Sequence, residues 1–176
     1  NIPGEGEHKI MDHIRASDGQ GSSVVYGLDA DLIFLCLVNF KKELTLVRES
    51  TFFGSSADQG YLYVKIPELR LLLHNSLAPK EQNTELATSP YVQKTMIDYA
   101  YMCFLHGNDF LPHIPSMLIR EGALDIAIQA YKKIRAKSMF VNLVQKGTVN
   151  SVILLQLLQE LQSVEGMGKK RAENVY

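Results

Sequence analysis

Acidic side chains form close pairs at two places in this chain of 176 residues, and a fifth acid lies in a third motif. Glu5 and Glu7 flank a glycine in PGEGEHKIMDHIR, Asp29 and Asp31 flank an alanine in YGLDADLIFLCL, and Asp109 lies in FLHGNDFLP. Two carboxylates this close repel each other unless water or a cation screens them. A pair taken alone is typical of a solvent-facing loop. Because Mg²⁺ prefers oxygen ligands, the three motifs together indicate a site for divalent cations.

The hydrophobic pattern places these motifs at the ends of regular elements. Residues 7–15 have apolar residues at helical spacing, so the glutamate pair lies at a helix N-terminus, where carboxylates suit the dipole. Residues 24–27 are typical of a buried strand, and Asp29 and Asp31 lie where this strand ends and a helix begins. Ligands of α/β sheets bind beyond the carboxyl ends of the strands. We therefore expect the acids to converge there, with Asp109 arriving after an apolar helix over 92–107.

The remaining pattern predicts one more strand and several helices. Residues 43–50 alternate with period two, 51–60 have the composition of an exposed loop, and 79–90 look like the least structured part. Further helices are expected over 67–77, 117–136 and 149–164. Strands that lead into helices predict an α/β fold with a partial parallel sheet flanked by helices and a mostly helical C-terminal part. A parallel sheet has to bury both of its faces, and two strands are too few to form such a sheet. We therefore expect strands from outside this sequence to complete it.

Composition limits the class of protein. The chain is 46% hydrophobic and 21% charged, which suits one globular domain or part of one. The run LIFLCLV at 32–38 is too short to span a membrane and no signal peptide is evident, so we expect an intracellular protein without membrane contact. Cys36 and Cys103 lie in apolar runs, which predicts buried free thiols. A net charge of −1 gives no general attraction to nucleic acid, but cations in an acidic site can still bind phosphate.

The three motifs, in this order, resemble the 5′→3′ exoribonuclease (XRN) family, a branch of the FEN/PIN-like nucleases. The resemblance runs from residue 3 to about 135 and is weaker beyond. It implies Mg²⁺-dependent (or Mn²⁺-dependent) hydrolysis of RNA with a 5′-monophosphate to mononucleotides, with two ions clamping the reacting oxygens. Carried over motif by motif, the metal-binding and catalytic acids are Glu5, Glu7, Asp29, Asp31 and Asp109, of which Glu7 and Asp29 are the strongest direct ligands.

The sequence also departs from the family pattern. The N-terminal part of the family, which supplies further acids and a basic pocket for the 5′ phosphate, has no counterpart here. We therefore expect an incomplete fragment, with 1–116 as the C-terminal part of the nuclease core and 117–176 as a helical extension of the same catalytic domain. Such a fragment, separated from its N-terminal part, is expected to be inactive and marginally stable. The motifs do not distinguish a nuclear from a cytoplasmic enzyme.

Two other functions stay open at this point. The chain fits a catalytically inactive RNA-binding or scaffold derivative of the fold, and GMGKKRA at 166–172 has the spacing of the helix-hairpin-helix turn of flap endonucleases. The basic run KKIRAK at 132–137 is expected to be a solvated helix face. His8, His106 and His113 flank the acids, and we expect them to pack or to support other side chains rather than to catalyse.

Overall fold

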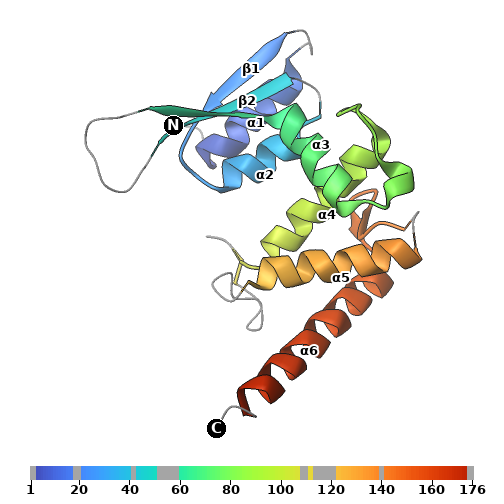
Figure 1. Cartoon of the computed structure of the whole chain (residues 1–176). Helices are drawn as coiled ribbons and strands as arrows, with labels where there is room; N and C mark the ends of the chain where they lie inside the picture. The colour runs from blue at the N-terminus through green and yellow to red at the C-terminus, as the bar shows by residue number, and fades with distance from the viewer. Residues whose placement is uncertain are drawn as a thin grey trace. The chain divides into compact units, whose positions relative to one another are not determined.

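The computed structural model describes residues 3–17, 21–40, 43–50, 60–107, 111–112, 122–138 and 141–173, with side chains up to Ser163. The chain divides into two compact units (Figure 1). The first comprises Asn1–Leu73 and Glu85–Gln93, and the second comprises His74–Thr84 and Lys94–Tyr176. The α/β class expected from the sequence is confirmed.

The first unit is built around a three-stranded sheet with the order β1-β2-β3. Its elements are α1 (Gly6–Ala16), β1 (Ser22–Tyr26), α2 (Asp31–Leu37), β2 (Glu43–Glu49), β3 (Tyr61–Lys65) and the first part of α3 (Ile66–Leu77). β1 and β2 are parallel, in the register Ser22↔Glu43 to Tyr26↔Val47. β3 runs antiparallel to β2, with Thr45 opposite Lys65. The sheet is therefore mixed, whereas the strand pattern had predicted only the parallel pair.

The core of the first unit lies between helices α1 and α2 and the inner face of the sheet. The spacing of apolar residues in each element decides which face is buried. The fully or nearly fully buried side chains are Met11, Ile14, Val25, Leu32, Cys36, Leu37, Leu44, Leu46 and Ile66. Gly27, directly after β1, leaves room for this packing, because a Cβ there would lie 2.3 Å from Cδ1 of Leu32 and the buried Leu32 side chain would have to shift. The loop that carries the aspartates is thus held against α2.

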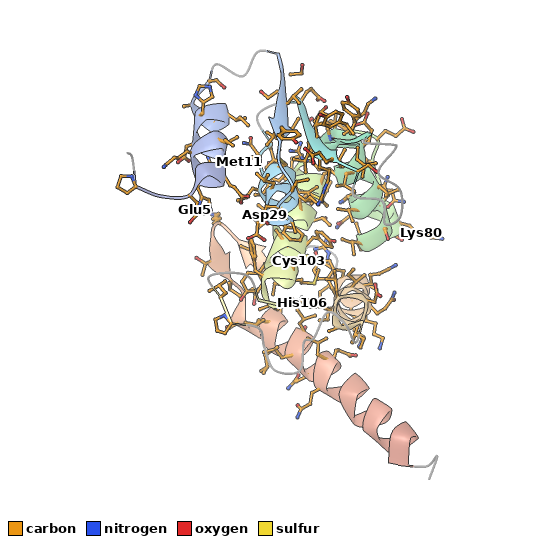
Figure 2. All side chains as sticks on the ribbon, turned by 90° about the vertical axis from the view of Figure 1, so that its left-hand side faces the viewer. Glu5, Met11, Asp29, Lys80, Cys103 and His106 are labelled. Carbon is orange, nitrogen blue, oxygen red and sulfur yellow. The ribbon has the colours of Figure 1, made fainter. Side chains whose placement is uncertain are left out.

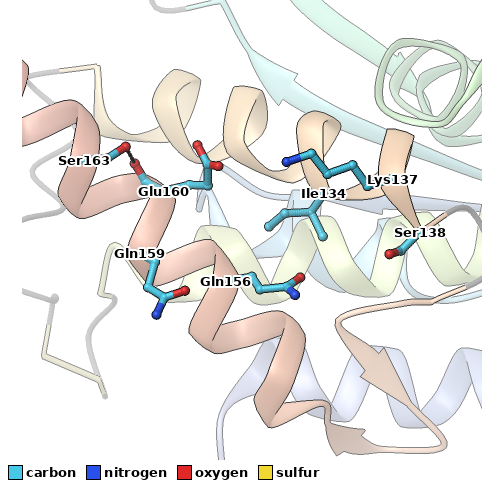
Figure 3. A pocket seen from close by; sticks show the side chains of 7 residues that line it. All are labelled: Ile134, Lys137, Ser138, Gln156, Gln159, Glu160 and Ser163. Carbon is cyan, nitrogen blue, oxygen red and sulfur yellow. Dashed lines mark hydrogen bonds between the residues drawn. The ribbon is translucent and has the colours of Figure 1, made fainter.

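The second unit is mostly helical. It contains the end of α3, η1 (Lys80–Gln82), most of α4 (Pro90–Phe104), α5 (Ala123–Lys137), the hairpin β4 (Val144–Gln145) and β5 (Thr148–Val149), and α6 (Ser151–Glu173). Asp98 of α4 is fully buried and accepts hydrogen bonds from α5 and from the start of the hairpin. α5 and α6 pack along a cavity of about 290 Å³ lined mainly by polar side chains, among them Lys137, Gln156 and Glu160 (Figure 3).

Two expectations are right only in part. Residues 79–90 hold little regular structure besides η1, but Gln82 is buried, its carbonyl lies 2.8 Å from Nε2 of His74, and its side-chain oxygen accepts from Arg135. In KKIRAK, Lys133 and Lys137 are exposed as a solvated face requires, but Arg135 is only 3% exposed and also donates to the carbonyl of Val141. Both departures arise because polar side chains here satisfy one another inside the fold.

Other expectations are confirmed or sharpened. Cys36 and Cys103 are buried free thiols. The C-terminal helix begins at Ser151 and continues to Glu173, so GMGKKRA lies inside α6 and does not form a hairpin turn. The expected helix over 117–136 is α5 from Ala123 onward, and residues 117–121 lie outside the described residues. In the part of the chain that the structure describes, no helix is both long enough and apolar enough to cross a membrane.

Candidate metal centre

The glutamate pair lies at the start of α1. Glu5 is the N-cap residue with extended backbone angles (φ −66°, ψ 144°), and Glu7 lies in the first helical turn. Gly4 has φ +103°, a backbone conformation that favours glycine. Within the described residues the Glu5 carboxylate makes no capping hydrogen bond. Glu5 is exposed and Glu7 is partly buried, so both carboxylates reach the surface at the same helix end.

The aspartate pair lies in the connection from β1 to α2. The backbone N–H of Gly27 donates to the carbonyl of Val47 at 3.1 Å, and Nη2 of Arg48 donates to the carbonyl of Leu28 at 2.8 Å. Both bonds attach the connection to β2. Oδ1 of Asp29 then accepts the backbone N–H of Asp31 at 3.1 Å, at the first residue of α2. Asp29 is exposed and Asp31 is partly buried, so both acids lie at the rim of the core.

The two acidic pairs lie at one end of the first unit. Helix α1 and strand β1 run in opposite directions, so the start of α1 and the end of β1 meet, as the labelled Glu5 and Asp29 show (Figure 2). The pKa of Glu7 is raised first by its partial burial and then by the negative charges of Asp29 and Asp31; His8 opposes this shift, and Glu5 adds the smallest contribution to it. Glu7 therefore feels the charges of both motifs, as convergence requires.

The four acids of the first two motifs do not by themselves form a complete metal site. Among the described residues, no three His, Cys, Asp or Glu side chains are placed to hold a metal ion together. Asp109, the fifth predicted acid, lies outside the described residues, as does His113. The structure thus shows the first two motifs near each other and leaves the third as a prediction.

The donor set fits a hard divalent cation better than a soft one. All the acids at this end of the unit offer carboxylate oxygens, the ligands that suit Mg²⁺ or Mn²⁺. Cys36 lies nearby on α2, but burial, with a smaller opposing effect of Arg70 and a contribution from Glu7, raises its pKa to about 11. Its side chain is also 0% exposed, so the thiol is not available to a cation held by the exposed carboxylates. His106 is buried in the second unit with Nδ1 3.0 Å from the carbonyl of Met102, which agrees with a packing role.

Sequence reasoning missed two arginines that hold the segments carrying the aspartates, one beside Asp29 and one at the far end of α2. Arg48 holds the carbonyl next to Asp29, and Arg70 of α3 donates to carbonyls at the C-terminal end of α2. Arg48 belongs to the alternating strand pattern and gives no separate signal. Arg70 does give a sequence signal, because it is the only Lys or Arg in the apolar helical segment PELRLLLHNSL. A charge in such a helix predicts a buried partner.

The chain matches two family models in sequence order. Residues 1–50 match the model described as XRN 5'-3' exonuclease N-terminus, and residues 91–175 match the model described as Xrn1 helical domain. A relative from Schizosaccharomyces pombe, 5'-3' exoribonuclease 1, is 35% identical over 94% of this chain and 13% of its own length. The 5'-3' exoribonuclease 2 homolog of Drosophila melanogaster is 31% identical over 94% of this chain and 22% of its own length. The 5'-3' exoribonuclease 2 of Saccharomyces cerevisiae is 31% identical over 94% of this chain and 19% of its own length. The chain thus spans less than a quarter of the length of these relatives.

Proposed function

The chain belongs to the XRN family of 5′-3′ exoribonucleases, and from this membership we propose that it forms part of an enzyme that degrades RNA from its 5′ end. The proposed reaction is hydrolysis of RNA with a 5′-monophosphate, with release of mononucleotides. Support for 5′-3′ exoribonuclease activity comes from the two matched models and from relatives that are named 5'-3' exoribonucleases. Because the chain spans 13% to 22% of these relatives, the activity is proposed for the whole protein.

The observation that carries the proposal is the electrostatic coupling of Glu7 to Asp29 and Asp31. The carboxylates of these two segments repel one another, and they would also repel the negative charge of a phosphodiester. A bound cation would remove both repulsions. We assign Glu5, Glu7, Asp29 and Asp31, together with Asp109 from the third motif, to the binding of two Mg²⁺ or Mn²⁺ ions. Divalent cations bound there would supply the positive charge that stabilises the negative charge developing on the phosphate during hydrolysis.

The residues of the chain have distinct tasks in this proposal. Asp29 uses one carboxylate oxygen to order the start of α2, which leaves its second oxygen as a donor atom for a cation. Glu7 has to lose its proton to bind a cation, and its raised pKa makes protons stronger competitors at this residue. Cation binding and therefore turnover should weaken as the pH falls through the pKa of Glu7. Recognition of the 5′-monophosphate is assigned to a part of the whole protein outside this chain.

The test uses the full-length protein that contains this chain. Asp29→Asn keeps an oxygen that can accept the N–H of Asp31, but removes the negative charge. We expect it to lower the turnover of 5′-monophosphorylated RNA with Mg²⁺ by roughly a hundredfold, the upper range for losses at metal sites. Asp12→Asn is the matched control, because Asp12 is exposed on α1 and pairs with Arg15, and it should leave turnover within about twofold.

Three results would count against the assignment. Turnover of Asp29→Asn equal to that of the parent would remove Asp29 from the site. A parent protein that binds RNA without degrading it would favour the inactive scaffold. Preference for branched DNA would favour a flap endonuclease, although the helical conformation of residues 166–172 removes the turn that motivated that alternative.

A further inference from the structure

Arg70 of α3 is a buried cation whose hydrogen bonds go to backbone carbonyls. It is 2% exposed, and its Nε donates to the carbonyl of Leu37 at 3.0 Å. Its Nη2 donates to the carbonyl of Cys36 at 2.8 Å and also to the carbonyl of Asn39. The guanidinium carbon lies 5.1 Å from the ring centroid of Phe40. These contacts place the charge at the C-terminal end of α2.

This position suits the physical needs of a short helix. The last four carbonyls of a helix have no partner within it, and its C-terminal end carries partial negative charge. α2 has only 7 residues, so it spans about 10 Å and has little cooperative stability of its own. A planar guanidinium can satisfy several of these carbonyls at once, which a lysine ammonium cannot do with the same geometry. Arg70 therefore fixes one end of the helix whose other end begins at Asp31.

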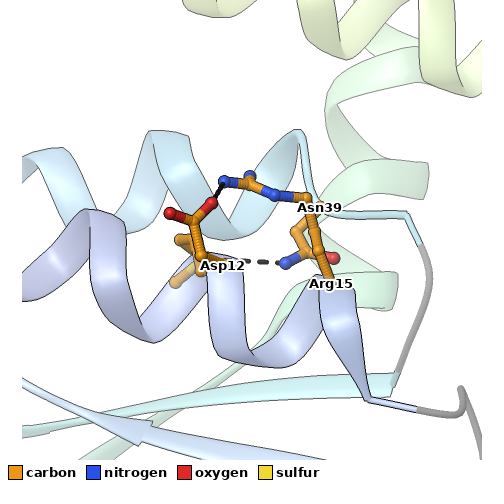
Figure 4. Close-up of polar contacts among 4 residues, drawn as sticks. Asp12, Arg15 and Asn39 are labelled. Carbon is orange, nitrogen blue, oxygen red and sulfur yellow. Dashed lines mark hydrogen bonds and ion pairs between the residues drawn. The ribbon is translucent and has the colours of Figure 1, made fainter.

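Asn39 connects the same end of α2 to α1. Its side chain is 2% exposed, and Nδ2 lies 3.7 Å from Sδ of Met11 (Figure 4). Met11 is fully buried and follows Glu7 by four residues, so the two side chains lie on one face of α1. The hydrogen bonds of Arg70 and Asn39 thus link α3, the end of α2 and the acid-bearing face of α1.

We propose that Arg70 and Asn39 are positioning residues that set the separation between the glutamates of α1 and the aspartates at the start of α2, and thereby the cation affinity of the site. This inference rests on the proposed function. Both acid-bearing helices are short, and they are joined at the end of α2 remote from its aspartates and at Met11 in the middle of α1, about one turn from Glu7. A change of tilt at that joint moves Asp31 relative to Glu7, and metal sites are sensitive to such displacements.

The experiment compares two variants with the parent by two measurements, each in the full-length protein that contains this chain. Arg70→Lys keeps the charge but loses the forked donor set, and Asn39→Ala keeps the carbonyl that Arg70 uses but loses the contact with Met11. Calorimetric titration with Mn²⁺ measures cation affinity, which should fall roughly tenfold in Arg70→Lys and less in Asn39→Ala. The Mn²⁺ concentration that gives half-maximal turnover of 5′-monophosphorylated RNA should rise by a similar factor, while turnover at saturating Mn²⁺ stays near that of the parent.

Arg135→Lys provides the matched control. Arg135 is also a buried arginine, 3% exposed, and it donates to the carbonyl of Val141 and to the side chain of Gln82, all within the second unit. We expect it to lower the melting temperature to a similar extent and to leave unchanged both the Mn²⁺ affinity and the Mn²⁺ concentration that gives half-maximal turnover.

The outcomes separate this inference from the proposed function. A parent protein that binds no Mn²⁺ would overturn the proposed metal site, and the inference with it. Folded variants that bind Mn²⁺ with the affinity of the parent would overturn the inference and leave the proposed function standing. If Arg70→Lys does not fold, Asn39→Ala decides alone. A loss of Mn²⁺ affinity in Arg135→Lys equal to that in Arg70→Lys would also overturn it, because the effect would then follow stability.

Discussion

Asp98 allows a quantitative prediction, because it is an acid buried without any expected metal role. Its Oδ2 accepts from Oη of Tyr131 at 2.7 Å, Nδ2 of Asn142 at 3.0 Å and the backbone N–H of Leu143 at 3.0 Å. Its Oδ1 accepts from the backbone N–H of Val144 at 2.8 Å. Asp98→Asn keeps one side-chain oxygen, but it replaces the other by an NH₂ group, which cannot accept the hydrogen bonds that these donors offer. If two buried donors lose their acceptor at about 2 kcal/mol each, the variant loses about 4 kcal/mol of unfolding free energy.

Urea denaturation followed by circular dichroism measures this loss. Tyr131→Phe removes one donor and leaves the carboxylate with its other partners, so it should lose only about 1 kcal/mol. Neither variant should change the affinity of the folded chain for Mn²⁺, because Asp98 is not among the assigned ligands. An unfolding free energy of Asp98→Asn within about 1 kcal/mol of the parent would show that the donors find other acceptors, and would refute the reasoning.

Three further predictions concern the first unit and the thiols. Glu7→Gln should raise the unfolding free energy of the metal-free chain at neutral pH by about 0.5 kcal/mol, the usual size of a like-charge effect. Folding raises the pKa of Glu7, so the negative charge of Glu7 destabilises the folded parent. This destabilisation is absent below the ordinary glutamate pKa, where Glu7 is protonated in both states, and it is complete once the pH exceeds the folded pKa. Equal gains in unfolding free energy at pH 3 and pH 7, measured by urea denaturation, would contradict this prediction. Gly27→Ala should lose about 2 kcal/mol in thermal unfolding, because the added Cβ meets buried Leu32, and an unchanged melting temperature would show that Leu32 moves aside freely. Cys36 and Cys103, with pKa values raised by burial to about 11 and about 12, should react with iodoacetamide only after denaturation, which mass spectrometry detects; rapid labelling of the native chain would show that these thiols are accessible.

Local patterns predicted most of the first unit. The run around Val25 and the alternation in 43–50 correspond to β1 and β2, and the aspartates lie between β1 and α2 as expected. β3 was missed because the strand has four exposed side chains and one partly buried one, so the period-two contrast that reveals a half-buried strand is absent. Hydrophobic patterns report burial, and this strand is held mainly by its ladder with β2.

Non-local polar contacts were beyond the reach of sequence patterns. Gln82 and Arg135 are 53 residues apart, yet their hydrogen bond buries both and orders a segment with the composition of a loop. The candidate site shows the same limit, because motif spacing predicted that the acids meet but gave no signal for Asn39 at the end of α2. Charges that lie deep in a fold depend on partners from distant segments, and spacing alone does not identify those partners.

The central claim, that acids distant in sequence are gathered around shared cations, is tested most directly by Mn²⁺ titration of the ¹⁵N-labelled chain. Bound Mn²⁺ broadens the amide signals of nearby residues. We expect substoichiometric Mn²⁺ to broaden the signals around Glu7 and Asp29 together, with those around Asp109 joining them. Broadening confined to one motif, or spread evenly over all exposed acids, would contradict the claim.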